Sequence, residues 1–126
     1  RGFAARLFAR ANHFKHERDI TMAITQVTLE NFQAEVSKSE KPVLLDFYAD
    51  WCGPCKVVSS ELEAFAEEND SVKVCKIDTD TQAVLASMYG ILSIPTLLLV
   101  RGGKEFARHA GGCEKQDIAD FVAANL

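Results

Sequence analysis

Two cysteines, Cys52 and Cys55, stand three residues apart within the segment 49–56, which reads ADWCGPCK. Two thiols at this spacing in the first turn of a helix can form a disulfide with little distortion, so the pair can open and close without refolding of the domain. The same spacing can supply two of the four ligands that zinc usually takes. The chain has no second pair of this kind, and the other two cysteines, Cys75 and Cys113, stand alone. The pattern therefore favours reversible thiol chemistry over a metal site.

The elements around this pair would place it at the start of a helix. Residues 42–48 form a short apolar run that opens with proline, which predicts a strand buried on both faces. Beyond the pair, Val58, Leu62 and Phe65 recur at helical spacing. Cys52 then lies at the helix N-terminus, where unpaired N–H groups and the macrodipole favour a thiolate and lower the pKa of the thiol. Cys52 is thus expected to be the nucleophile, and the second cysteine the less exposed thiol.

The segment 51–56, WCGPCK, resembles the active site of the thioredoxin family. Further landmarks follow in the order that the family has them: Asp46 inside the preceding strand, the run Tyr89-Gly90-Ile91, the run Ser93-Ile94-Pro95-Thr96, and Gly111-Gly112 ahead of a last helix. The resemblance covers roughly residues 22–126. It implies an α/β thioredoxin fold, in which a central mixed β-sheet is flanked by helices on both faces, preceded here by a basic N-terminal extension.

The resemblance also implies roles for two charged residues. Asp46 lies within an apolar strand, where burial disfavours the charged carboxylate and raises its pKa. In the family this carboxyl lies beneath the cysteine pair, where it can take a proton from Cys55 through water. Lys76 matches the lysine that lies near that carboxyl, so it joins Cys52, Cys55 and Asp46 in the expected catalytic set. A plain solvated lysine remains the alternative for Lys76.

A second segment would complete the site on the substrate side. The resemblance implies a cis bond between Ile94 and Pro95, held against the cysteines, so that the backbone of Ile94 can pair with an extended segment of a substrate. The expected substrate-binding surface is flat and apolar, and its members are Trp51, Gly53, Pro54, Ile94, Pro95 and Gly111.

The function that follows is the reduction of protein disulfides by dithiol–disulfide exchange. The Cys52 thiolate attacks a substrate disulfide, a mixed disulfide forms, and Cys55 releases the reduced product. The family implies that a thioredoxin reductase, a flavoprotein that draws on NADPH, then restores the dithiol, and that no cofactor binds this chain itself. The expected partners are that reductase and disulfide-containing proteins. A binding module of the same fold, whose thiols are incidental, is the alternative.

Composition sets wider limits. The 126-residue chain has a net charge of −4 and is 48% hydrophobic, which predicts one globular domain with a substantial core. Residues 1–21 carry five Lys or Arg against two acidic residues, a net of +3, which leaves −7 for residues 22–126. An acidic body argues against nucleic acid as a partner. No apolar run reaches the ~18 residues of a membrane-spanning helix, so no membrane partner is expected. Four cysteines favour a reducing, cytoplasmic location over a disulfide-stapled scaffold.

Residues 1–21 form a leader with a composition of its own. Its apolar side chains, Phe3 and Leu7 among them, share one side of a helical wheel, while Arg6 lies on the other side. An Arg-rich, acid-poor amphipathic stretch resembles a mitochondrial transit peptide, which would give an organellar location instead. The alternatives are a leader unrelated to the fold and a helix that docks on a neighbouring molecule. We expect the domain to comprise residues 22–126, and the protein to be a monomer unless the leader drives self-association.

From Thr25 the pattern predicts the order β, α, β, α, β, α, β, β, α. The expected elements beyond the cysteine strand and helix are a helix from Thr28 to about Lys38 that buries Leu29, Phe32 and Val36; a strand over 72–78; a short helix capped by Thr79, Asp80 and Thr81 that ends at Tyr89-Gly90; a hairpin of 96–100 and 105–110 across Gly102-Gly103; and a helix from about Glu114 that buries Ile118, Phe121 and Val122. The hairpin would form the antiparallel edge of the sheet.

Four residues depart from the family pattern or stand outside it. Tyr48 replaces a tryptophan that is common at its position, and Ser60 stands where many members have a helix-kinking proline. Cys75, within an apolar strand, is expected in the core. Cys113 is expected near the rim of the substrate surface, as an incidental or a regulatory thiol.

Overall fold

The computed structural model describes residues 24–126, so the leader at 1–21 lies outside the described residues. The elements in order are β1 (Ile24–Gln26), η1 (Gln33–Ser37), β2 (Val43–Tyr48), α2 (Gly53–Glu68), β3 (Lys73–Asp78), α3 (Ala83–Met88), β4 (Thr96–Arg101), β5 (Lys104–Ala110) and α4 (Lys115–Asn125). This order confirms the predicted succession of strands and helices, although the first helix is a five-residue π-helix, η1.

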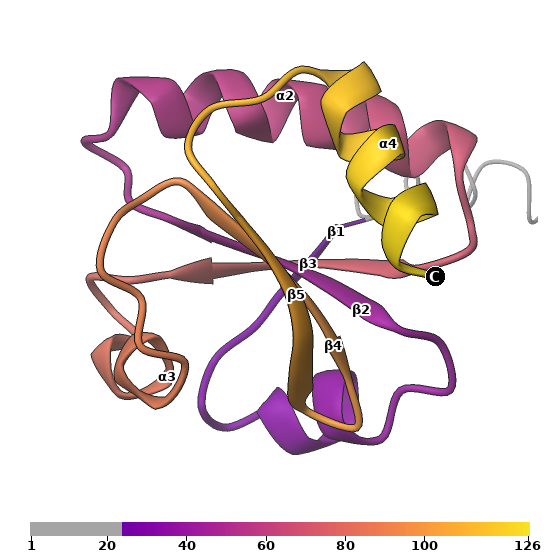
Figure 1. Cartoon of the computed structure of the whole chain (residues 1–126). Helices are drawn as coiled ribbons and strands as arrows, with labels where there is room; N and C mark the ends of the chain where they lie inside the picture. The colour runs from indigo at the N-terminus through magenta and orange to yellow at the C-terminus, as the bar shows by residue number, and fades with distance from the viewer. Residues whose placement is uncertain (1–23) are drawn as a thin grey trace, which may run out of the picture.

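The strands form a single mixed sheet in the order β1-β3-β2-β4-β5. β1, β3 and β2 run parallel, whereas β4 is antiparallel to β2 and β5 is antiparallel to β4. The hairpin of β4 and β5 turns at Gly102-Gly103 and supplies the antiparallel edge, as predicted. Helices cover both faces of this sheet, with α2 and α4 on one side and η1 and α3 on the other (Figure 1). The expected fold class is therefore confirmed.

Two apolar clusters hold the layers together, because alternate residues of each central strand point to opposite faces. The cluster between the sheet and α2 and α4 contains Leu44, Val58, Leu62, Phe65, Val72, Val74, Leu97, Leu99, Cys113, Ile118 and Val122. The cluster between the sheet and η1 and α3 contains Val27, Val36, Val43, Leu45, Phe47, Cys75, Ile77, Leu85, Leu98 and Val100. β2 contributes to both clusters, which confirms that it is buried on both faces.

Strand register sets four side chains in one row across the α2 face of the sheet. The row runs from β3 to β5 and consists of Lys76, Asp46, Leu97 and His109. Asp46 shares its face with Leu44, which packs in the α2 cluster. At the end of the row, the His109 ring lies 5.9 Å from the Phe121 ring of α4. The only aspartate in β2 is thus held between the sheet and the helix that begins at the cysteines.

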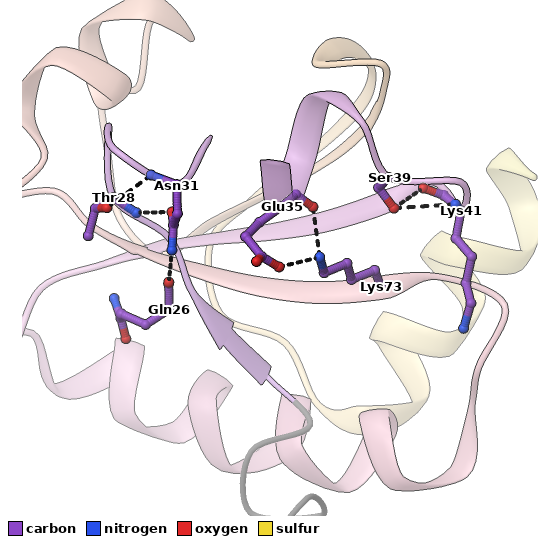
Figure 2. Close-up of polar contacts among 7 residues, drawn as sticks. All are labelled: Gln26, Thr28, Asn31, Glu35, Ser39, Lys41 and Lys73. Atoms are coloured by element: carbon purple, nitrogen blue, oxygen red, sulfur yellow. Dashed lines mark hydrogen bonds and ion pairs between the residues drawn. The ribbon is translucent and has the colours of Figure 1, made fainter. Parts of the chain in front are cut away.

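The expected helix from Thr28 to Lys38 is wrong in its first turn. The Asn31 side chain accepts a hydrogen bond from the Thr28 N–H (2.7 Å), and the Thr28 hydroxyl accepts one from the Asn31 N–H (3.4 Å). These reciprocal bonds close a turn before the helix starts (Figure 2). Leu29 therefore lies outside the helical pattern and is 53% exposed, not buried as predicted. Val36 is buried, and Phe32 packs partly against the same cluster.

Further contacts fix η1 against the sheet. The Lys73 ammonium on β3 donates to the carboxylate and the backbone carbonyl of Glu35, at 2.6 and 2.9 Å (Figure 2). Just beyond η1, the Ser39 hydroxyl donates to the Lys41 carbonyl, which shapes the turn into β2. The two Lys73 bonds anchor η1, which has only five residues, to β3.

The cap predicted for α3 is also wrong. The N-cap residue is Gln82, and its side chain makes no capping bond. The polar residues ahead of it act elsewhere: the Thr79 hydroxyl donates to the Tyr48 carbonyl, and the Asp78 carboxylate accepts from the Asp80 N–H. The C-terminal end matches the prediction, because Gly90 adopts φ +61°, where glycine is favoured.

The last helix, α4, follows the prediction closely. Glu114 is its N-cap, and its side chain and that of Asp117 form a reciprocal capping box. Ile118 and Val122 are buried, whereas Phe121 is only partly buried beside His109. α4 packs across α2 and closes the core on that face.

Candidate active site

The two cysteines lie at the first turn of α2 and form a disulfide, with their Cα atoms 5.3 Å apart. Cys52 is the N-cap of the helix, and its sulfur accepts a hydrogen bond from the Cys55 N–H at 3.2 Å. Pro54 occupies an early helical position, where its missing N–H costs nothing. Both residues are buried, Cys52 at 5% exposed slightly less than Cys55 at 2%. A negative charge on Cys52 would be stabilised by this N–H and by the helix dipole.

Asp46 is completely buried in β2, and neither of its carboxylate oxygens has a hydrogen-bond partner among the described residues. Burial raises the pKa of Asp46 from its usual 3.8 to about 7, and the positive charge of Lys76 partly opposes this rise. A carboxyl with this pKa is able to accept or release a proton near neutral pH.

Lys76 lies on β3 in register with Asp46, yet its ammonium makes its hydrogen bond elsewhere. It donates to the Ser59 hydroxyl on α2 at 2.8 Å and lies 4.5 Å from the centroid of the Tyr48 ring. A small pocket of about 90 Å³ opens here, lined by Tyr48, Ala49, Asp50, Cys55, Lys56, Ser59 and Lys76. The inner cysteine and Lys76 thus share one pocket.

The loop before β4 faces the cysteines. The Ile94–Pro95 peptide bond is cis, as expected from the family resemblance. Ile94 packs against the small cluster that contains both cysteines. The Gly111 N–H donates to the Pro95 carbonyl at 2.9 Å, which ties the end of β5 to this loop. Gly111 adopts φ +105°, a conformation that other residues rarely take.

The outer part of the expected surface is exposed. Trp51 is 72% exposed, and its indole N–H donates to the Asp80 carboxylate at 2.9 Å, which fixes the ring beside the cysteines. Gly53 and Pro54 are exposed at the start of α2. The structure therefore brings Trp51, the helix start and the cis-proline loop to one end of the molecule.

Two residues of this region were not singled out from the sequence. Leu92, in the loop before the cis bond, is 97% exposed, and only its place two residues before Ile94 could have drawn attention to it. Ser59 follows Cys55 by four residues, so helical spacing places both on one side of α2. Its bond to Lys76 joins two elements, and the sequence carries no signal for that contact.

The two remaining cysteines are buried. Cys75 is in the core, as predicted, and burial raises the pKa of its thiol to about 12. Cys113, expected near the rim of the substrate surface, has a buried side chain that packs in the cluster under α2 and α4. Burial, with Asp117, Asp46 and Glu61 nearby, raises the pKa of its thiol to about 11. Both thiols are therefore protonated at neutral pH.

A disulfide at the N-terminus of a helix, preceded by a central strand and faced by a cis-proline loop, defines a thiol–disulfide oxidoreductase with a thioredoxin-like fold. The chain belongs to the thioredoxin family, since the family model Thioredoxin matches residues 23–124. It is 44% identical over 98 residues to a thioredoxin of Porphyra purpurea, which covers 77% of this chain and 92% of that protein.

Other relatives span the same part of the chain. A thioredoxin of Acidithiobacillus ferridurans is 41% identical over 105 residues, covering 82% of this chain and 97% of the relative. A thioredoxin 1 of Nostoc is 39% identical over 105 residues, covering 82% and 98%. The chain is accordingly a protein-disulfide reductase that works by dithiol–disulfide exchange through Cys52 and Cys55. Members of this family need no bound cofactor. Among residues 24–126, no helix is both long and apolar enough to cross a membrane.

Proposed function

We propose that the reaction cycle assigns separate roles to the two cysteines. The Cys52 thiolate attacks one sulfur of a substrate disulfide, so that a mixed disulfide forms and the other substrate sulfur leaves as a thiolate. Cys55 then loses its proton and attacks the Cys52 sulfur. The substrate leaves with both sulfurs reduced, and the chain keeps the Cys52–Cys55 disulfide that the structure contains. Two electrons pass from the chain to the substrate in each cycle.

Asp46 is the proposed acceptor of the Cys55 proton, with water as the carrier. The support is its burial without a hydrogen-bond partner and the resulting pKa of about 7. Lys76 contributes by moderating this pKa through its charge. An exposed aspartate with an ordinary pKa would be too weak a base to take a proton from a thiol at neutral pH.

The proposed substrate surface combines the cis-proline loop with the start of α2. An extended substrate segment would pair with the backbone of Ile94 and lie over Trp51, Gly53, Pro54 and Gly111. The exposed indole and the contact of Ile94 with the cysteine cluster support this arrangement. Leu92 would extend the apolar area at one side.

The proposed electron donor is a thioredoxin reductase, a flavoprotein that uses NADPH. Its task would be to attack the oxidised pair and return it to the dithiol. We also propose that residues 22–126 are the functional domain and that it acts as a monomer in the cytoplasm. If residues 1–21 are a transit segment, the location would be an organelle instead.

The observation that carries the proposed cycle is the unequal position of the two sulfurs at the helix N-terminus. Reduction of insulin by dithiothreitol, followed by turbidity, tests it. The wild-type chain should accelerate precipitation, and Cys52→Ser should abolish the effect. Cys55→Ser should instead trap a mixed disulfide that non-reducing electrophoresis detects. A wild-type chain that binds partners but never accelerates the reaction would indicate a binding module.

A further inference from the structure

An ammonium group and an unpaired carboxyl lie on neighbouring strands without forming an ion pair. Asp46 and Lys76 are directly opposite each other in the β2–β3 register, and both side chains lie on the α2 face. A lysine side chain at that position is long enough to reach the carboxylate. Both oxygens of Asp46 nevertheless have no partner among the described residues, and Lys76 donates to Ser59 instead.

The position of the Lys76 ammonium is fixed by two groups outside β3. The Ser59 hydroxyl on α2 accepts its hydrogen bond at 2.8 Å, and the Tyr48 ring lies under it at 4.5 Å. Both contacts draw the ammonium toward the pocket that Cys55 also lines. A hydrogen bond depends on direction more than the attraction of an ammonium to an aromatic face does, so the hydroxyl is the more specific of the two restraints.

We propose that Ser59 is a positioning residue for disulfide reduction: its hydroxyl holds the Lys76 ammonium in the pocket, away from Asp46, and so keeps the carboxyl able to take a proton at neutral pH. This inference rests on the proposed role of Asp46 as proton acceptor for Cys55. Without the hydroxyl, the Lys76 ammonium loses its hydrogen bond and can turn toward the unpaired Asp46 carboxylate. Asp50, the other carboxylate beside Lys76 in the pocket, is exposed, so water screens its attraction for the ammonium. A direct ion pair with Asp46 would stabilise its charged carboxylate and weaken it as a base.

The groups around Asp46 other than Lys76 do not place a positive charge beside its carboxyl from β4 or from β2 itself. Cys113, in the segment before α4, lies near Asp46, and its thiol stays protonated at neutral pH. Cys55 on α2 is in the disulfide and does not titrate in the oxidised protein. The neighbour of Asp46 in register on β4 is the apolar Leu97, which separates it from His109 on β5. On its own strand Tyr48 is neutral, since burial raises the pKa of its phenol. Burial is thus the main cause of the raised pKa of Asp46, and Lys76 is the charged group that opposes it.

The test is a pH titration of the Asp46 carboxyl carbon by NMR in the oxidised protein. The wild-type midpoint should lie near 7. In Ser59→Ala it should fall by about 1 unit or more, as expected when an opposite charge moves into contact. Ser59→Thr keeps the hydroxyl and should restore the wild-type midpoint. A midpoint that is unchanged or raised in Ser59→Ala would overturn the proposal.

Two matched variants separate the proposed contact from general effects on the helix. Ser60→Ala removes the neighbouring hydroxyl, which is exposed on α2, and should leave the midpoint unchanged. Lys76→Met should raise the midpoint, and adding Ser59→Ala to it should have no further effect, because the ammonium that the hydroxyl holds is gone. If Lys76→Met leaves the midpoint at its wild-type value, Lys76 does not act on Asp46 and the proposal fails.

The titration also separates this inference from the proposed proton transfer. In reduced Ser59→Ala, the rate at which the mixed disulfide is resolved should fall several-fold at pH 7, while the attack by Cys52 is unchanged. If the midpoint falls but the rate of resolution does not, the positioning of Lys76 stands and Asp46 is not the proton acceptor.

Discussion

Cys52 differs from the other three cysteines in its surroundings rather than its chemistry. Its sulfur meets a backbone N–H at the start of α2, whereas Cys75 and Cys113 are enclosed by apolar side chains that raise the pKa of their thiols to about 12 and 11. A thiolate reacts with alkylating agents and a thiol does not, so these differences translate into rates.

Iodoacetamide at pH 7 should therefore modify Cys52 of the reduced protein well before Cys55, Cys75 or Cys113. Mass spectrometry of peptides taken at short times measures the order. Cys52→Ser should slow total labelling to the level of the buried thiols. Faster labelling of Cys55 than of Cys52 would reverse the assignment of the attacking and resolving thiols.

Asp46 lowers stability at neutral pH as a consequence of its buried position. With a pKa of about 7 in the folded chain and 3.8 as its ordinary value, it binds its proton more tightly when folded. The two states are both protonated below pH 3.8, so no penalty exists there. The penalty grows as pH rises toward 7 and then stays constant, reaching roughly 4 kcal/mol for about three pKa units.

Asp46→Ala should thus be more stable than the wild type at pH 8 and lose that advantage near pH 4, where only the cost of a small cavity, roughly 1 kcal/mol, remains. Urea denaturation at both values measures the difference in free energy of unfolding. Asp46→Asn keeps the size of the side chain and should show the same pH-dependent gain. If neither variant gains stability over the wild type between pH 4 and pH 8, folding does not raise the pKa of Asp46.

For single residues, the sequence was sufficient to predict the environment of a side chain wherever that environment is set by neighbouring residues in the chain. The cysteine spacing predicted the reacting thiols, and the position of Asp46 inside an apolar run predicted a buried carboxyl. Ser59 could not be found in this way, because its importance comes from Lys76, which lies 17 residues further along the chain. The burial of Cys113 could not be found for the same reason, since the side chains that cover it include Val58 and Leu62 of α2, far earlier in the chain.

Among the elements, the β4–β5 hairpin depends on two glycines in the left-handed region, with φ +60° at Gly102 and +81° at Gly103. A Cβ on Gly103 would meet the Ser37 hydroxyl at 3.1 Å, whereas one on Gly102 would meet nothing within 4 Å. The Gly103 carbonyl also accepts a bond from the Tyr89 hydroxyl at 2.6 Å. The turn therefore couples the hairpin to η1 and to the end of α3.

Gly103→Ala should lower the free energy of unfolding by about 1–2 kcal/mol, because alanine is disfavoured at this φ and the added methyl crowds Ser37. Equilibrium denaturation measures the loss. Gly112→Ala, at a position with ordinary φ and open space, is the control and should be close to neutral. Equal losses in the two variants would mean that the turn conformation is not what makes Gly103 necessary.

The elements whose boundaries were predicted well are those with a long periodic pattern. α2 and α4 carry apolar residues at helical spacing over several turns, and the hairpin has turn glycines directly after the apolar strand β4. The errors fell on η1 and α3, which are short. There, side chains such as Asn31 and Asp78 form local turns that compete with the helix, and propensity alone does not decide between them.

For the whole molecule, both apolar clusters that the structure describes are built from the helices and strands of residues 24–126. The catalytic pair, the cis-proline loop and Asp46 all lie inside that range as well. The sequence predicted this layered arrangement from the alternation of strands and helices. The order of the strands was not predicted, because pairing partners far apart in the chain leave no local pattern.

Deletion of residues 1–21 should leave the rate of insulin reduction unchanged and shift the free energy of unfolding by no more than about 1 kcal/mol, the usual size of a change that leaves the core intact. Comparing the full chain and the shortened one by turbidity and by denaturation checks both expectations. A loss of several kcal/mol would place the domain boundary before residue 22.

The strand register also fixes where the two ends of the described chain lie. Ile24 begins β1 opposite Val74, level with the start of β2, while the cysteines follow the far end of that strand. Leu126 lines a shallow pocket with Arg101, which ends β4 at the hairpin turn beside the start of β2. A resin, electrode or fluorescent protein joined at Leu126 would therefore be attached at the end of the sheet opposite the cysteines. The cysteines would remain accessible, which suits the reduction of large proteins by the immobilised chain.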